Sequence, residues 1–218
     1  MIYIMPYFKN QNINILFIHI PKTGGTSIEN FLSKKYNIEL NLNSLHKETS
    51  NFNPLLPGIY GKASLQHQKL ETLHKFKGLL KINFQNLTIF TIVRNPYNRL
   101  VSDLFFFKLI KKDSKPNQVF EVIKKYLKSN KMDNHNIPQN EFILINNEIP
   151  DDVKVLKLEN LNEDIKKQKL EFLNNFNIQK NKGKINQNKY LSYLNRDSIN
   201  LINKFYHKDF ELFNYDKL

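Results

Sequence analysis

Residues 17–32 read FIHIPKTGGTSIENFL and join two patterns of different period. The stretch begins inside Ile13–Ile20, which is almost wholly apolar and rich in β-branched and aromatic residues. Such a run is typical of a strand buried on both faces in a parallel sheet. After the glycines, Ile28, Leu32 and Tyr36 recur at the spacing of one helix face. The sequence therefore predicts a strand, a glycine turn and a helix.

The turn between this strand and helix has the composition of an anion-binding loop. Backbone N–H groups at a helix N-terminus have no intrahelical partner and attract anions together with the helix dipole. We expect Gly24 and Gly25 to let a phosphate approach the backbone, with Thr26 and Ser27 supplying hydroxyls and a helix cap. Lys22 adds a positive charge, but it precedes the glycines, so the loop is not a Walker A motif. The alternative is an ordinary tight connection between a strand and a helix.

A second junction of the same kind follows residues 87–93 (LTIFTIV), another buried-strand pattern. Asn95 is a good N-cap and Pro96 is favoured at the first helical position, so a helix begins there. Arg94 ends the strand and Ser102 follows eight residues later, on the polar side of the helix. A guanidinium near a hydroxyl suits a second phosphate, although a surface salt bridge would use the same arginine.

The rest of the chain continues the alternation of strands and helices. Residues 153–158 predict a third strand, and the C-terminal apolar stripe from Ile199 to Phe213 predicts a terminal helix. Shorter elements are predicted as helices over 68–76, 118–128 and 161–172, a strand over 59–65 and a loop over 174–188. This order indicates an α/β fold, three-layered and P-loop-like, with a mainly parallel sheet flanked by helices. We expect one domain over residues 1–218, with 1–11 as a short N-terminal extension.

Composition narrows the class of partner without choosing one. The 218-residue chain carries a formal charge of +13, which attracts anions such as nucleic acid, acidic glycans, anionic lipids or polyphosphorylated ligands. It contains no cysteine, which excludes disulfides and thiolate metal sites, and no apolar run long enough to span a membrane. These features predict an intracellular protein without stable membrane insertion.

Four segments of the chain are informative together: HIPKTGGTS, IVRNPYNRLVSDLFFF, VKVLKLENL and YHKDFELFNYD. They resemble segments of the PAPS-dependent sulfotransferases, particularly the carbohydrate branch that includes the heparan sulfate 2-O-sulfotransferases. The resemblance implies that PAPS is the co-substrate and PAP the product, with a carbohydrate or glycoconjugate acceptor. It implies that the loop residues hold the 5′-phosphosulfate and that an arginine, a serine and a later lysine hold the rest of the nucleotide. By this resemblance, Arg94 and Ser102 would hold the 3′-phosphate, Lys182 would be a helper, and the 5′ loop would comprise Lys22, Thr23, Gly24, Gly25, Thr26 and Ser27.

Position between the two phosphate motifs makes His67 the candidate catalytic base, by resemblance to the histidine of related 2-O-sulfotransferases. Lys22 would stabilise the leaving phosphate during an in-line displacement that requires no metal. His135, in a segment that resembles an H-x-x-P-Q motif of carbohydrate sulfotransferases, either lines the acceptor site or orders a loop. His19 lies within the first strand, where we expect a buried, hydrogen-bonded side chain.

Two functions of other classes use the same surface features. A kinase-like phosphoryl transferase would need a metal-binding Asp at a strand end, where the sequence has Pro-Lys and Arg-Asn instead. A non-catalytic basic module would bind polyanions, but no RNA- or DNA-binding motif is present and nucleic acid is not the expected partner. The expected setting is the cytoplasm of a bacterium.

Overall fold

Three apolar runs form neighbouring parallel strands. The computed structural model describes residues 5–38, 64–129, 132–176 and 187–218. Within them, β2 (Asn14–Ile18) pairs in parallel with β3 (Thr88–Val93), which pairs in parallel with β4 (Val153–Lys157). The strands predicted over 13–20, 87–93 and 153–158 are thus confirmed, and the ends of β2 and β3 lie side by side.

An antiparallel strand closes the β2 edge of the sheet. β1 (Tyr7–Lys9) pairs with β2 and gives the strand order β1-β2-β3-β4. The segment expected to be an N-terminal extension over residues 1–11 therefore contributes a strand to the sheet. Among the described residues, no helix is both long and apolar enough to span a bilayer.

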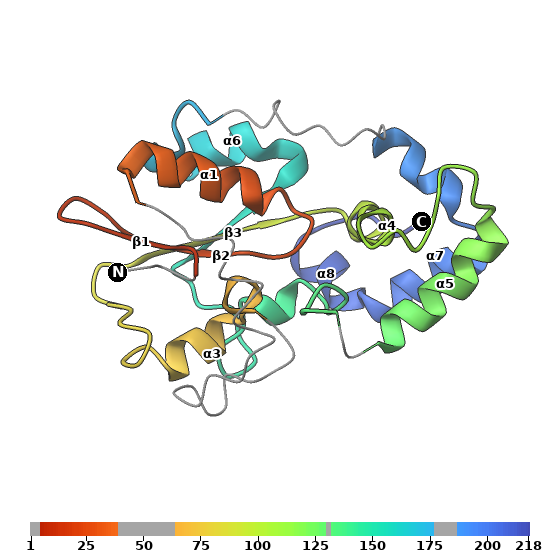
Figure 1. The fold of residues 1–218 in the computed structure, drawn as a ribbon, viewed down its shortest axis with the longest axis horizontal. Helices are drawn as coiled ribbons and strands as arrows, with labels where there is room; N and C mark the ends of the chain where they lie inside the picture. Colours follow the sequence, from red (N-terminus) through yellow and green to blue (C-terminus); the bar gives the residue numbers. More distant parts are fainter. Residues whose placement is uncertain (1–4, 39–63, 130–131, 177–186) are drawn as a thin grey trace.

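Helices cover both faces of the sheet, as Figure 1 shows. Alternating side chains of β2 serve the two faces: Ile15 and Phe17 pack on the side of α1 (Gly25–Tyr36) and α6 (Leu161–Lys167). Leu16 and Ile18 pack on the opposite side, in the cluster that contains α3 (Leu70–Lys75). This alternation follows from the two-residue repeat of a strand. The predicted three-layer α/β arrangement is confirmed.

A third apolar cluster holds the helical half of the molecule, at the right of Figure 1. Its four helices are α4 (Pro96–Phe106), α5 (Pro116–Lys128), α7 (Arg196–Phe205) and α8 (His207–Leu212). Short 3₁₀ helices connect these parts: η1 (Leu65–His67), η2 (Asn140–Phe142), η3 (Leu158–Asn160), η4 (Glu171–Leu173) and η6 (Gln187–Tyr193). The Asn95 side chain accepts hydrogen bonds from the Tyr97 and Asn98 amides, which confirms the predicted start of α4.

Two predicted helices are interrupted in the structure. The C-terminal stripe belongs to two helices that break at Tyr206, whose hydroxyl donates to the buried carbonyl of Asn136. The helix predicted over 161–172 ends at Lys167, because Lys169 adopts a left-handed φ of 53°. The strand predicted over 59–65 lies largely outside the described residues, and Leu65 begins η1 instead.

Candidate active site

The loop before α1 leads into a helix start that has no side-chain cap. Gly24 is the N-cap residue with a φ of 91°, a left-handed conformation that glycine adopts without strain. The helix has no side-chain cap, so the expected cap from Thr26 or Ser27 is wrong. Lys22 also has a left-handed φ of 66°, which is uncommon for a residue with a side chain. An uncapped helix start is a ready anion site.

Packing against His19 gives a second reason for a glycine at position 25. A Cβ atom on Gly25 would lie 2.2 Å from Cδ2 and 2.3 Å from Nε2 of His19, so this glycine makes room for an imidazole. The hydroxyl of Thr23 is buried and donates to the Ile20 carbonyl at 2.8 Å. The Thr23 hydroxyl therefore stabilises the conformation of the loop.

Arg94 lies directly against the loop, as the paired-junction argument predicts. Its Nη1 donates to the carbonyl of Lys22 at 3.1 Å, across 72 residues of sequence. The arginine is only 4% exposed, and its buried Nε has no hydrogen-bond partner. No carboxylate of the described residues forms an ion pair with it. A buried cation with a spare donor fits an anionic ligand.

The surroundings of the guanidinium confirm that it is desolvated. Burial lowers the pKa of Arg94, although nearby Tyr190 and Glu159 favour the charged form. The Tyr190 ring lies 5.5 Å from the guanidinium carbon, and both carboxylate oxygens of Glu159 are engaged elsewhere. The arginine is therefore held by the Lys22 carbonyl and the Tyr190 ring.

The Lys22 ammonium rests on an exposed aromatic ring. Its Nζ lies 4.0 Å from the centre of the Phe106 ring, and Phe106 is 56% exposed. Burial lowers the pKa of Lys22, and the neighbouring Arg94 lowers it further, against the opposing effect of Asp103. Two cations at this junction, each lying over an aromatic ring, favour binding of an anion between them.

Two residues that sequence reasoning missed fix the junction. The Gln139 side chain brackets the Arg94 backbone, accepting from its N–H at 2.9 Å and donating to its carbonyl at 2.8 Å. The buried Arg99 guanidinium donates to three carbonyls, those of Pro21, Ile137 and His135. The R-N-P-x-x-R spacing places both arginines on one strand end and helix start, which is the local signal for Arg99.

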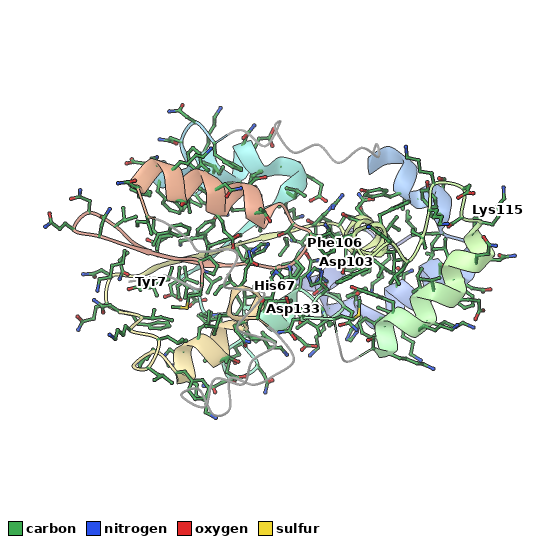
Figure 2. All side chains as sticks on the ribbon, in the orientation of Figure 1. Tyr7, His67, Asp103, Phe106, Lys115 and Asp133 are labelled. Carbon is green, nitrogen blue, oxygen red and sulfur yellow. The ribbon has the colours of Figure 1, made fainter. Side chains whose placement is uncertain are left out.

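Three buried histidines line the same region, each bonded to its own carboxylate. His67 meets His19 and His135 edge to face, with ring centres 5.0 Å and 4.9 Å apart. Each Nδ1 faces a carboxylate: His19 with Glu29 at 2.7 Å, His67 with Asp133 at 2.8 Å and His135 with Asp103 at 2.8 Å. The prediction for His19 is confirmed. Figure 2 shows His67, Asp133 and Asp103, together with Phe106, near the centre of the molecule, and Tyr7 and Lys115 toward its ends.

Histidine 135 connects the base candidate with the lysine. Its ring stacks on Phe106, with centroids 5.6 Å apart and planes 10° apart. Asp103, which holds the His135 Nδ1, also accepts a hydrogen bond from the Tyr126 hydroxyl. A continuous row thus runs from Lys22 over Phe106 and His135 to His67.

His67 is held neutral at physiological pH. Burial lowers its pKa to about 4, despite a hydrogen bond to Asp133 that favours the charged ring. A neutral imidazole can accept a proton, as a general base must. The structure therefore provides a proton acceptor that two intervening rings, Phe106 and His135, connect with the Lys22 ammonium.

The remaining predicted site residues differ in position. Ser102 is half-buried on α4, two turns beyond Asn95. Lys182 lies outside the described residues. A cavity of about 530 Å³ between Lys69, Asn140 and His207 contains none of the predicted site residues.

One group of the described residues has the composition of a cation site. His67, Asp133 and His135 each place a potential ligand atom within 4.8 Å of the others. The Nδ1 atoms of both histidines already face carboxylates, since His67 bonds Asp133 and His135 bonds Asp103.

The comparison with known families agrees with this geometry. Residues 5–216 match the sulfotransferase family. Neither the curated proteins nor the solved structures yield a match to the chain. Because the family match covers nearly the whole chain, the protein belongs to the sulfotransferase family and is a PAPS-dependent transferase.

Proposed function

We propose that this enzyme transfers the sulfuryl group of PAPS to a hydroxyl of a carbohydrate acceptor, with His67 as base. The observation that carries the proposal is the 3.1 Å contact between the Arg94 guanidinium and the Lys22 carbonyl. It brings the two strand-to-helix junctions together, so that one nucleotide with phosphates at its 5′ and 3′ positions can span them. The sulfotransferase family match supports PAPS as that nucleotide.

The described residues fit such a nucleotide at both ends. The uncapped start of α1 and the Lys22 ammonium suit a 5′-phosphosulfate. The buried Arg94, with an unpartnered Nε, suits a 3′-phosphate, to which Ser102 could add a hydroxyl. Lys182 stays a prediction from the resemblance.

The chemistry assigned to the protein is positioning and charge stabilisation. Lys22 and the α1 amides would bind the oxygens on which negative charge grows as the bond from sulfur to the leaving phosphate breaks. His67 Nε2 would accept the proton of the attacking hydroxyl, since its Nδ1 is bonded to Asp133. The imidazolium formed in this way would lie beside the Asp133 carboxylate.

The proposed acceptor is a hydroxyl of an acidic sugar. The resemblance to carbohydrate sulfotransferases favours a sugar hydroxyl, and the formal charge of +13 suits an acidic glycan. The exposed Phe106 ring, beside both Lys22 and His135, offers an apolar surface on which a sugar ring could lie. His135 would then shape the acceptor site from below that ring.

Calorimetric titration with PAP in the presence of a chelator tests the proposal. We expect PAP to bind without a divalent cation and ATP to bind far more weakly, because ATP lacks a 3′-phosphate. Binding of ATP that requires magnesium, with no heat from PAP, would favour a kinase-like function and refute the proposal. Lys22→Ala should weaken PAP, whereas Lys124→Ala, which removes an exposed lysine that also rests on an aromatic ring, should leave binding unchanged.

A further inference from the structure

The His67 ring is held by contacts with residues that are distant in the sequence. The residue is only 6% exposed, and its ring meets two histidine rings, those of His19 and His135, edge to face. The only carboxylate of the described residues that bonds it is Asp133, 66 residues further along the chain. Asp133 is therefore the group that can decide which ring nitrogen carries the proton.

Asp133 is itself held in one orientation. The Ser64 N–H donates to Asp133 Oδ1, and the Ser64 hydroxyl donates to Oδ2 at 3.0 Å. Asp133 and Asn134 both adopt left-handed φ angles, 48° and 60°, and the Asn134 amide donates to the His67 carbonyl at 2.9 Å. This turn grips the η1 segment at both its ends.

An ionised carboxylate can only accept hydrogen bonds. Burial works against ionisation of Asp133, but the hydrogen bonds from His67 and Ser64 prevail and lower its pKa. At neutral pH the His67 Nδ1 must therefore be the donor, and the proton of the neutral ring lies on Nδ1. The lone pair is then on Nε2, on the side of the ring away from Asp133.

We propose that Asp133 is the positioning residue of His67: it selects the Nδ1–H tautomer and so presents a basic Nε2 to the acceptor hydroxyl. The assignment of His67 as base rests on the proposed function, whereas the tautomer can be measured without it. The same contact would stabilise the imidazolium after proton transfer, as the aspartate does in other histidine–aspartate pairs.

In the Asp133→Asn variant the two side-chain atoms that replace the carboxylate oxygens differ, because one is an acceptor and the other a donor. The Ser64 N–H donates to Oδ1, so the asparagine oxygen should keep that position and its NH₂ group should face His67. An NH₂ group can only donate, so Nδ1 would have to accept and the ring proton would move to Nε2. The variant should then retain the fold and PAP binding but lose the basic nitrogen that faces the acceptor.

Nitrogen-15 NMR of the histidine side chains at neutral pH reads the tautomer directly. His67→Gln assigns the signals, and the signals of His19 and His135 report whether the neighbouring pairs stay intact. We expect Nδ1–H for His67 in the wild type and Nε2–H in Asp133→Asn, with PAP affinity within about twofold of the wild type. A His67 that keeps Nδ1–H in Asp133→Asn, or that carries Nε2–H in the wild type, would overturn the proposal.

A second variant guards against a loss of fold. Asp133→Glu keeps a carboxylate and should restore Nδ1–H, at least in part, if ionised acceptor chemistry selects the tautomer. The loss of Nδ1–H in both variants would point to a purely structural effect and count against the proposal. Absence of PAP binding with the expected tautomers would refute the sulfotransferase assignment of the site while leaving the His67–Asp133 pair established.

Discussion

Replacing Arg94 with methionine separates nucleotide recognition from folding. The variant loses one hydrogen bond to the Lys22 carbonyl, worth about 1 kcal/mol. It also removes a desolvated charge without an ion-pair partner, which offsets that loss. We expect the free energy of unfolding to stay within about 1 kcal/mol of the wild type.

Binding of the 3′-phosphate should change far more. Hydrogen bonds to charged groups contribute about 1.5–3 kcal/mol each, so two from the guanidinium give roughly 3–4 kcal/mol after incomplete additivity. This corresponds to a loss of PAP affinity of about 100-fold to 1,000-fold. Adenosine 5′-phosphate lacks the 3′-phosphate, and its affinity should fall by less than about threefold.

Calorimetry with both nucleotides on both proteins completes a double-mutant cycle. In the wild type PAP should bind much more tightly than adenosine 5′-phosphate, and in Arg94→Met this preference should vanish. Arg196→Met is the matched control, since Arg196 is an exposed arginine at the start of α7. An equal loss of affinity for the two nucleotides in Arg94→Met would refute the assignment of this arginine to the 3′-phosphate.

Three further changes test other parts of the site. Gly25→Ala should destabilise the fold by about 1–3 kcal/mol in urea unfolding, because its Cβ would overlap the adjacent imidazole, whereas Gly78→Ala, with nothing within 4 Å, should stay within about 0.5 kcal/mol. Phe106→Ala should tighten PAP binding by about twofold to fivefold, since a cation–π contact of about 0.5–1 kcal/mol no longer competes for Lys22. Phe120→Ala removes a similar contact on α5 and should leave PAP binding unchanged. Weaker PAP binding in Phe106→Ala would contradict this account. The pKa of His67 falls on folding from 6.5 to about 4, so the unfolded chain binds the proton first as pH falls. The free energy of unfolding should therefore drop by about 3 kcal/mol between pH 6.5 and pH 4 in the wild type, and this drop should be absent in His67→Gln. Equal pH dependence of the two proteins would argue against a buried neutral ring.

Local sequence patterns predicted the framework of the sheet and its junctions. Buried strands read as unbroken apolar runs, and the helix start at Asn95–Pro96 carries its own capping chemistry. The neighbouring positions of Lys22 and Arg94 followed from parallel strands whose carboxyl ends share one edge. These features depend on a few adjacent residues or on a general rule of topology.

The partners of the histidines could not be predicted in the same way. Asp133 is 66 residues from His67, and Asp103 is 32 residues from His135, with no period that connects them. Gly25 illustrates the same limit, because the reason for its missing side chain is a ring from the preceding strand. Only the folded chain shows which acidic residue meets which base.

The three carbonyls bonded by Arg99 belong to two walls of the site, the loop at Pro21 and the segment at His135 and Ile137. A single rigid fork thus ties both walls to α4, and neither wall can move outward without breaking hydrogen bonds to the other's anchor. Ordering the loop with a nucleotide should therefore slow amide hydrogen exchange in the distant segment as well. Through Arg99, binding of the nucleotide at the loop would thus also stabilise the segment at His135 and Ile137, where the acceptor is proposed to bind.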